Sequence, residues 1–261
     1  MGKIYSALGL MSGTSMDGVD ASIIQSDGET NCKAIFNKYY EYNKGLFEDL
    51  TSLRDKIYNL KDLNKMGPEI VSLEKEITLF HAKICNEIIK DSGLEIDFIG
   101  FHGQTIYHNV EEKISKQIGD GNLLSQLVKK KVVYNFRKND LENGGEGAPL
   151  TPIYHKSLVE FLERKEKIKT PINILNIGGI ANLTLINSNY EMMSRDIGPG
   201  NCLIDKWMRK NSDKKYDENG KSAKLGKIDK FIFNQSLDNF YNNDISKKKS
   251  LDTNDFDISF A

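Results

Sequence analysis

Short apolar runs, separated by loops rich in glycine and polar residues, predict several β-strands. IYSALGL (4–10) and VDASIIQ (19–25) flank the polar segment MSGTSMDG, which predicts two strands joined by a tight loop. IDFIGF (96–101) leads directly into HGQT and predicts a strand that ends there, and VVYNF (132–136) predicts another. Runs of this length are typical of strands that are buried in a sheet.

Apolar residues recur at spacings of three and four between residues 70 and 88, which predicts an amphipathic helix. Pro68 suits the first turn of this helix, and Gly93 suits the position just after its end. Shorter helices are expected at 122–130, 152–164, 201–210 and 222–240. Because strands and helices alternate along the chain, the pattern indicates an α/β fold.

A strand–glycine turn–strand unit occurs twice, as GLMSGTSMDGVDASII (9–24) and ILNIGGIANLTLI (174–186). Two such units far apart in one chain indicate two related α/β halves that face each other across a cleft. The alternative is a chance similarity between two β-hairpins. We therefore expect a first lobe at 1–150 and a second lobe at 151–261.

Composition excludes several classes of protein. The chain has 36 Lys+Arg against 37 Asp+Glu and is 39% hydrophobic, which excludes a disordered chain and gives no electrostatic case for nucleic-acid binding. No apolar stretch approaches the roughly 18 residues that a membrane-spanning helix needs, and no segment resembles an export signal. The three widely separated cysteines match neither a zinc cluster nor a disulfide framework. These features favour a cytoplasmic protein.

The loop MSGTSMDGVD has the composition of a phosphate-binding turn. Gly13 and Gly18 allow backbone N–H groups to converge on one point, and Asp17 and Asp20 could hold Mg²⁺ beside a bound phosphate. Three hydroxyl groups add further donors: those of Ser12, Thr14 and Ser15. The loop lacks the lysine of a P-loop and is not a GxGxxG motif. The alternative interpretation is a polar hairpin turn without a ligand.

The segment HGQTIYH follows a predicted strand, where side chains project at the edge at which open α/β sheets bind ligands. We expect His102 and Gln104 to hydrogen-bond a polar ligand there. A metal site formed by His102 and His108 is the weaker alternative, because no third ligand is evident.

The stretch FRKNDLENGGEGAPLTP contains Arg137, one of only five arginines in a chain that otherwise uses lysine. The planar guanidinium group of arginine can bind a carboxylate or phosphate with two hydrogen bonds, which would explain why arginine stands here. The alternative is a structural ion pair with Asp140. Gly144, Gly145 and Gly147 predict an irregular loop that could pack closely on a ligand or on another backbone segment.

A second acidic candidate lies in SRDIGPGNCLID. Asp196 is expected at the end of a strand, and Gly198, Pro199 and Gly200 predict a sharp turn into a helix. A carboxylate near a helix N-terminus and at a cleft edge is well placed to take a proton. The alternative is a capping or turn aspartate.

Five motifs, in order over residues 8–207, are similar to those of the 1,6-anhydro-N-acetylmuramic acid kinases: GLMSGTSMDGVDAS, GFHGQTIYH, FRKNDLENGGEGAPLTP, LNIGGIANLT and DIGPGNCLIDKW. The resemblance implies the two-lobed fold shared by actin, hexokinases and heat-shock ATPases. It also implies that the substrate is 1,6-anhydro-N-acetylmuramic acid, a fragment released in bacterial peptidoglycan turnover. Enzymes of this family open the anhydro bridge with water and phosphorylate O6 with ATP, which gives N-acetylmuramic acid 6-phosphate and ADP.

The resemblance implies roles for individual residues. Asp196 falls on the position of the family's catalytic base, which deprotonates the water that attacks the anomeric carbon. Asp17 would hold Mg²⁺, which neutralises phosphate charge. The expected ATP-binding residues are Gly13, Thr14, Ser15, Met16, Asp17, Gly18, Val19, Asp20, Gly178 and Gly179. The expected substrate-binding residues are His102, Gln104, Arg137, Asp140, Gly147 and Asn176.

The chain departs from the family pattern at three points. Glu146 stands where the family has Gln, and Ile197 stands where it has Thr. Family members also extend further than Ala261, so we expect the second lobe to be incomplete if the chain ends there. Two other functions remain open: a conventional sugar kinase that acts on a free hydroxyl, and a non-catalytic sugar- or nucleotide-binding protein. The family suggests dimers, with no nucleic acid or membrane as a partner.

Overall fold

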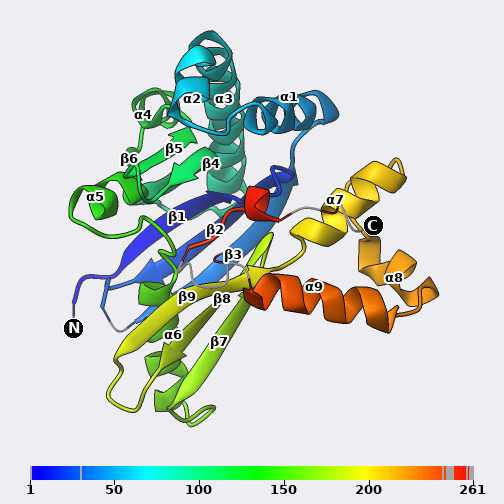
Figure 1. Cartoon of the computed structure of the whole chain (residues 1–261). Helices are drawn as coiled ribbons and strands as arrows, with labels where there is room; N and C mark the ends of the chain where they lie inside the picture. The colour runs from blue at the N-terminus through cyan, green and yellow to red at the C-terminus, as the bar shows by residue number, and fades with distance from the viewer. Residues whose placement is uncertain (1, 30, 243, 245–249, 257, 259–261) are drawn as a thin grey trace. The chain divides into compact units, whose positions relative to one another are not determined.

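The structure is a computed structural model that describes residues 2–29, 31–242, 244, 250–256 and 258. The chain divides into two compact units, Met1–Thr170 and Pro171–Ala261 (Figure 1). Helix α6 (Pro152–Arg164) belongs to the first unit because it contacts β3 (Cys32–Glu41). The boundary between the two units lies after Thr170. The two functional lobes expected at 1–150 and 151–261 remain a prediction.

A six-stranded sheet forms the centre of the first unit, in the order β3-β2-β1-β4-β5 with β6 paired to β4. Its other strands are β1 (Tyr5–Ser12), β2 (Gly18–Ser26), β4 (Phe98–Asn109), β5 (Ile114–Ile118) and β6 (Lys131–Tyr134). The β1–β2 and β2–β3 pairs are antiparallel, whereas the β1–β4 and β4–β6 pairs are parallel. The strands expected at 4–10 and 19–25 are confirmed. The sequence did not predict β3, because most of its residues are exposed and no apolar run marks it.

Strand β4 is longer than its apolar run, so the end expected at residue 101 is wrong. The chain continues through Gly103, which has φ +70°, and the pairing of β1 with β4 shifts register in this region. A Cβ atom at Gly103 would lie 2.5 Å from a backbone oxygen of β5, so this position requires glycine. The bulge places His102 and Gln104 inside the strand and not after it.

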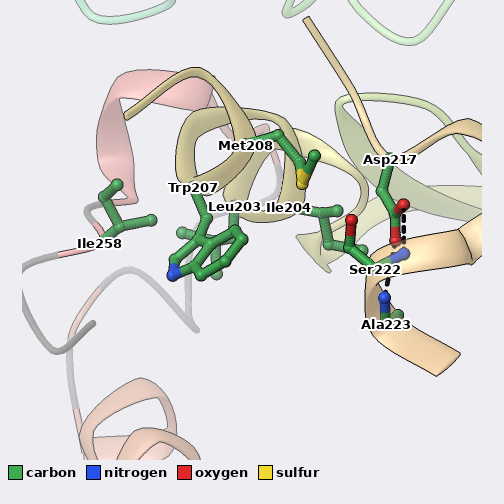
Figure 2. Close-up of a pocket in the computed structure, with 8 residues that line it drawn as sticks. All are labelled: Leu203, Ile204, Trp207, Met208, Asp217, Ser222, Ala223 and Ile258. Atoms are coloured by element: carbon green, nitrogen blue, oxygen red, sulfur yellow. Dashed lines mark hydrogen bonds between the residues drawn. The ribbon is translucent and has the colours of Figure 1, made fainter. Parts of the chain in front are cut away.

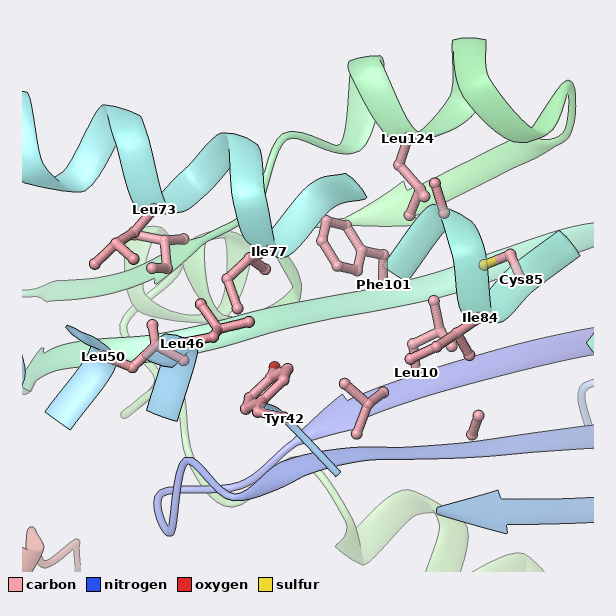
Figure 3. Close-up of a cluster of buried hydrophobic side chains, with 14 of the residues drawn as sticks. Leu10, Tyr42, Leu46, Leu50, Leu73, Ile77, Ile84, Cys85, Phe101 and Leu124 are labelled. Carbon is pink, nitrogen blue, oxygen red and sulfur yellow. The ribbon is translucent and has the colours of Figure 1, made fainter. Parts of the chain in front are cut away.

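The helices of the first unit are α1 (Lys44–Asp55), α2 (Leu60–Lys65), α3 (Gly67–Ser92), α4 (Gly121–Val128), α5 (Phe136–Glu142) and α6. The long amphipathic helix is confirmed as α3, with Gly93 in the left-handed conformation at its end. The expectation of irregular structure from residue 137 is wrong in part, because α5 occupies 136–142. Apolar residues of α3 such as Ile77 and Ile84 pack with Leu10 and Phe101 in the core of this unit (Figure 3).

A three-stranded antiparallel sheet forms the centre of the second unit, with strand order β7 (Ile172–Ile177), β8 (Ile180–Ile186) and β9 (Met192–Pro199). The β7–β8 hairpin repeats the antiparallel pairing of β1–β2, and β9 adds to β8 as β3 adds to β2. The repeated unit seen in the sequence therefore extends over three strands in each half of the chain.

The helices of the second unit are α7 (Cys202–Asn211), α8 (Lys221–Leu225) and α9 (Lys230–Asn242). The single helix expected at 222–240 is wrong, because the backbone is extended at Gly226 and a new helix begins after Asp229. The Asp229 carboxylate accepts hydrogen bonds from the N–H groups of Phe231 and Ile232, as an N-cap residue does.

The α/β class expected from the sequence is confirmed. Within the described residues, the structure contains no helix that is long and apolar enough to cross a membrane.

Candidate active site

The loop between β1 and β2 is held by side chains from elsewhere in the first unit. The Gly13 oxygen accepts a hydrogen bond from Gln104 Nε2 at 2.9 Å, and the Thr14 oxygen accepts one from Arg54 Nη1 at 3.0 Å. Met16 has φ +57°, and its side chain is fully buried in the core. These contacts fix the loop backbone before any ligand arrives, as a preorganised binding loop requires.

Asp17 lies at the end of this loop and takes part in several contacts. Its Oδ1 accepts a hydrogen bond from Ser15 Oγ at 2.5 Å, and its backbone oxygen accepts one from the Tyr42 N–H at 2.9 Å. Burial, followed by the charge of Asp17, raises the pKa of Asp20. Burial and the charge of Asp17 also raise the pKa of Tyr39, which hydrogen-bonds Asp17.

Three of the residues expected to bind ATP have a packing role in the structure. The side chains of Met16 and Val19 are fully buried, so only their backbone could contact a ligand. A Cβ atom at Gly18 would lie 2.3 Å from the Tyr40 oxygen and 2.7 Å from the Tyr39 ring. Gly18 is therefore required by the close approach of β3, whatever else it does.

The donor set around Asp17 suits Mg²⁺ only if the ion shares its ligands with a phosphate. The described residues contain no group of three His, Cys, Asp or Glu side chains that could hold a metal ion. Mg²⁺ in kinases typically binds one or two protein carboxylates and completes its shell with phosphate oxygens and water. Asp17 and Asp20 fit that arrangement.

His102 and Arg137 form a second cluster in the first unit. His102 Nδ1–H donates to the Gly103 oxygen at 2.7 Å, and Arg137 Nε–H donates to His102 Nε2 at 3.1 Å. Burial, followed by the charge of Arg137, lowers the pKa of His102 to about 4, so this imidazole is neutral at pH 7. Since both ring nitrogens are engaged, the geometry gives no support to a metal site formed by His102 and His108.

Arg137 and Asp140, both on α5, bind the same residue of the glycine loop. Arg137 Nη1 donates to the Gly147 oxygen at 2.7 Å, and the Gly147 N–H donates to Asp140 Oδ2 at 2.7 Å. A Cβ atom at Gly145 would lie 2.2 Å from the Asp140 carboxylate, so only glycine fits beside it. Arg137 thus binds the backbone oxygen of Gly147 and Asp140 binds its N–H, and together they fix the shape of the glycine loop.

Gln104 is fully buried beneath the β1–β2 loop. Its Nε2 donates to the Gly13 oxygen, and its Oε1 has no hydrogen-bond partner among the described residues. Strand β4 thus carries Gln104, which holds the β1–β2 loop, and His102, which orients Arg137. In this arrangement both side chains bind protein groups.

Asp196 belongs to the second unit and is buried, with 8% of its surface exposed. Strand β9 continues past it to Pro199, so the expectation that Asp196 ends a strand is wrong. Its Oδ2 accepts a hydrogen bond from the Leu251 N–H at 2.8 Å. Asp196 lies opposite Asn182 on β8, whose Oδ1 is buried without a partner in the described part of the chain. Cross-strand neighbours share a face of the sheet, and two acceptors there suit a donor such as water or a sugar hydroxyl.

The Gly178–Gly179 turn packs directly on the start of α7. The Gly178 oxygen accepts from the Asn201 N–H at 2.8 Å, and the Gly179 oxygen accepts from the Gly200 N–H at 2.9 Å. A Cβ atom at Gly200 would lie 2.2 Å from the Gly178 oxygen, so this contact requires glycine. Asn176, on β7, is exposed.

An apolar pocket of about 330 Å³ lies at α7 and α8 of the second unit (Figure 2). It is lined by Leu203, Ile204, Trp207, Met208, Asp217, Ser222, Ala223 and Ile258. The lining does not include Asp196. Asp217 accepts hydrogen bonds from the N–H groups of Ser222 and Ala223, so its carboxylate caps α8.

Sequence reasoning missed three residues that touch the candidate sites. Arg54, which binds the β1–β2 loop, is one of five arginines, and the rarity that marked Arg137 could have marked it too. Asn182 lies within the matched motif LNIGGIANLT. Leu251 contributes a backbone N–H, for which no side-chain pattern exists.

The first unit thus contains a sheet with a glycine-containing loop that is suited to bind phosphate. The sheet of the second unit carries a buried carboxylate. A family model described as "Anhydro-N-acetylmuramic acid kinase" matches residues 5–260. The protein named "Anhydro-N-acetylmuramic acid kinase" in Pelagibacter ubique (strain HTCC1062) is 59% identical over 263 residues, which cover 100% of this chain and 69% of the relative. The protein of the same name in Brucella canis is 37% identical and covers 99% of this chain and 69% of the relative.

This chain therefore belongs to the anhydro-N-acetylmuramic acid kinase family, and it is a phosphotransferase. It spans about 69% of the length of these two relatives. A solved structure titled "Structural Study of the Aquifex aeolicus PPX-GPPA enzyme" aligns with 81% of this chain and 57% of that chain, at 11% identity and a TM-score of 0.36.

Proposed function

We propose that this protein opens 1,6-anhydro-N-acetylmuramic acid with water and phosphorylates O6 with ATP, giving N-acetylmuramic acid 6-phosphate and ADP. Membership of the kinase family over residues 5–260 carries this proposal. The buried carboxylate of Asp196 in the second unit adds chemical support, because the reaction needs a base. Because N-acetylmuramic acid is a sugar of peptidoglycan, the proposed reaction belongs to the recycling of cell-wall fragments, and we place it in the cytoplasm, where ATP is available.

Asp196 is the base in this proposal. Its carboxylate takes a proton from the water that attacks the anomeric carbon, and the C1–O6 bond breaks as the C1–O(water) bond forms. O6 is then free to attack the γ-phosphate, because a bridging ether oxygen is a poor nucleophile until that bond weakens. The neighbouring Asn182 Oδ1, a buried acceptor without a partner among the described residues, is suited to orient the same water.

The β1–β2 loop is the phosphate site in this proposal. The loop backbone at residues 13–15 and the exposed Thr14 hydroxyl bind the phosphates in this proposal, while Gln104 and Arg54 hold the loop through the Gly13 and Thr14 oxygens. Asp17 and Asp20 would hold Mg²⁺ together with the phosphates. That ion supplies charge neutralisation at the transferred phosphoryl group.

The Arg137–Gly147 cluster is the sugar site in this proposal. Neutral His102 orients Arg137, and the clamped glycine loop presents its backbone groups to the muramic acid. The lactyl carboxylate of the substrate is a natural partner for an arginine. Asn176, which is exposed on β7, is a further candidate for a sugar contact.

An ADP-release assay in ¹⁸O-labelled water tests the proposal. We expect ADP to form only when the anhydro sugar is present, and the product to carry one labelled oxygen at C1. N-acetylmuramic acid 6-phosphate kept in labelled water for the same time corrects for spontaneous exchange at the anomeric hydroxyl. ADP release on a free sugar without label uptake would indicate a conventional sugar kinase. Binding without ADP release would indicate a sugar- or nucleotide-binding protein.

We expect Arg137→Lys to lower kcat/KM for the anhydro sugar by about 10- to 100-fold although it keeps the positive charge. Arginine reaches His102 Nε2 with Nε and the Gly147 oxygen with Nη1, and the single compact ammonium group of lysine does not reproduce this fixed planar pair of donors. Steady-state kinetics with varied sugar measure this effect. Arg164→Lys, at the exposed end of α6, is the matched control and should leave the constants unchanged. Wild-type kinetics for Arg137→Lys would remove Arg137 from the sugar site.

A further inference from the structure

The segment Leu251–Phe256 of the second unit reaches the proposed base through its backbone. The Leu251 N–H donates to Asp196 Oδ2 at 2.8 Å, and both residues are buried, with 9% and 8% of their surfaces exposed. A hydrogen bond to one oxygen of a carboxylate restricts rotation of the group about its last torsion. The direction of the Asp196 carboxylate therefore depends on where this segment lies.

Lys206 on α7 holds the segment at its far end. Its Nζ donates to the Thr253 oxygen and to the Phe256 oxygen, both at 2.6 Å. Charge-assisted hydrogen bonds of this kind are shorter and stronger than those between neutral groups. A single side chain thus closes the turn formed by residues 253–256.

Hydrogen bonds within the segment and one aromatic contact to α9 hold its shape. The Asp252 N–H donates to Asp255 Oδ2 at 2.8 Å, and the Asp255 N–H donates to the Asp252 oxygen at 3.0 Å. The Phe256 ring stacks on Phe240 of α9, with centroids 6.2 Å apart. Because the turn is internally bonded, a displacement at the Lys206 end is transmitted to Leu251.

We propose that Lys206 is a positioning residue for the reaction. It holds the Leu251–Phe256 segment in place, and this segment in turn orients the Asp196 carboxylate. The role given to Asp196 rests on the proposed function, whereas the link from Lys206 to Leu251 rests on the contacts alone. A base must lie within hydrogen-bond reach of the proton it takes, and small displacements of catalytic groups cost large factors in rate. Lys206 lies within α7, the helix that follows β9, so base and anchor belong to one continuous stretch of chain.

Lys206→Met tests the proposal, because methionine keeps the unbranched shape and the helix propensity of lysine, is one atom shorter, and removes the donors. We expect hydrogen–deuterium exchange of the amides in 251–256 to accelerate at least about tenfold. We also expect kcat to fall about 10- to 100-fold, with the KM values for ATP and sugar within about twofold of wild type. Lys206→Arg, which restores the donors, should recover most of the exchange protection and of kcat.

Lys210→Met is the matched control, since Lys210 is an exposed lysine in the last turn of the same helix. It should leave both exchange and kcat unchanged. Unaltered exchange in Lys206→Met would overturn the proposal, and so would faster exchange with unaltered kcat in an active enzyme. If the wild-type protein releases no ADP, the proposed function fails. The exchange measurement then decides by itself whether Lys206 holds the Leu251 contact.

Discussion

Asp196→Asn is expected to lower kcat by about 10²- to 10⁴-fold while ATP still binds. The change removes the proton acceptor and keeps the shape of the side chain, and the amide oxygen of asparagine can still accept the hydrogen bond from Leu251. Strand β9 and the 251–256 segment should therefore keep their positions. The coupled ADP assay measures kcat, and calorimetric titration with a non-hydrolysable ATP analogue measures nucleotide affinity.

Asp229→Asn is the control for this variant. Asp229 caps α9 through its carboxylate, and asparagine is an equally good N-cap, so this change should leave both activity and stability as they are. If Asp196→Asn retained activity within a factor of a few of wild type, another group would have to take the proton. A parallel loss of ATP affinity would indicate a misfolded second unit, which the melting temperature would show.

The sequence predicted those parts of the fold in which a local pattern determines the structure. The β1–β2 hairpin and α3 were expected within a few residues, because apolar periodicity and the stops at Pro68 and Gly93 act locally. Strand β3 depends on pairing with β2 and carries mostly exposed residues, so no local pattern marks it. In the same way, the β4 bulge at Gly103 resembles a strand end in sequence, although pairing with β1 and β5 continues beyond it.

The candidate sites were predicted as motifs and not as contacts. Gln104 was expected to face a ligand, but its side chain is buried and binds the Gly13 oxygen. Arg137 and Asp140 were considered as an ion pair, and the structure shows both bound to Gly147. Each of these outcomes depends on the path of the backbone between distant residues, and a single sequence does not contain that path. The residue types indicate the chemistry of these side chains, whereas their hydrogen-bond partners follow only from the three-dimensional structure.

We expect acidification from pH 7 to pH 5 to lower the free energy of unfolding by about 4 kcal/mol through His81 and His102. His81 is fully buried on α3, where Nδ1–H donates to the Ile77 oxygen at 2.8 Å and Nε2 lies 3.4 Å from Ser12 Oγ. Burial lowers the pKa of His81 to about 4, and burial with the Arg137 charge lowers the pKa of His102 to about 4, against 6.5 for an ordinary histidine.

Because the folded-state pKa values lie below the unfolded-state value, the unfolded chain binds more protons between pH 6.5 and pH 4. The stability that neutral histidines provide is therefore complete above pH 6.5 and is lost as the pH falls. Each pH unit is worth about 1.4 kcal/mol per group, so roughly 1.5 units give about 2 kcal/mol for each histidine at pH 5. Urea unfolding at pH 7 and pH 5, followed by circular dichroism, measures the difference.

The variant His81→Gln separates this effect from general acid denaturation. Glutamine removes one titrating group, so the loss of stability between pH 7 and pH 5 should shrink by about 2 kcal/mol, even if the variant is less stable at pH 7 because the aromatic contacts of His81 are gone. Equal unfolding free energies at the two pH values in the wild type would contradict the prediction. An unchanged slope in His81→Gln would show that the protons are taken up at groups other than this buried imidazole.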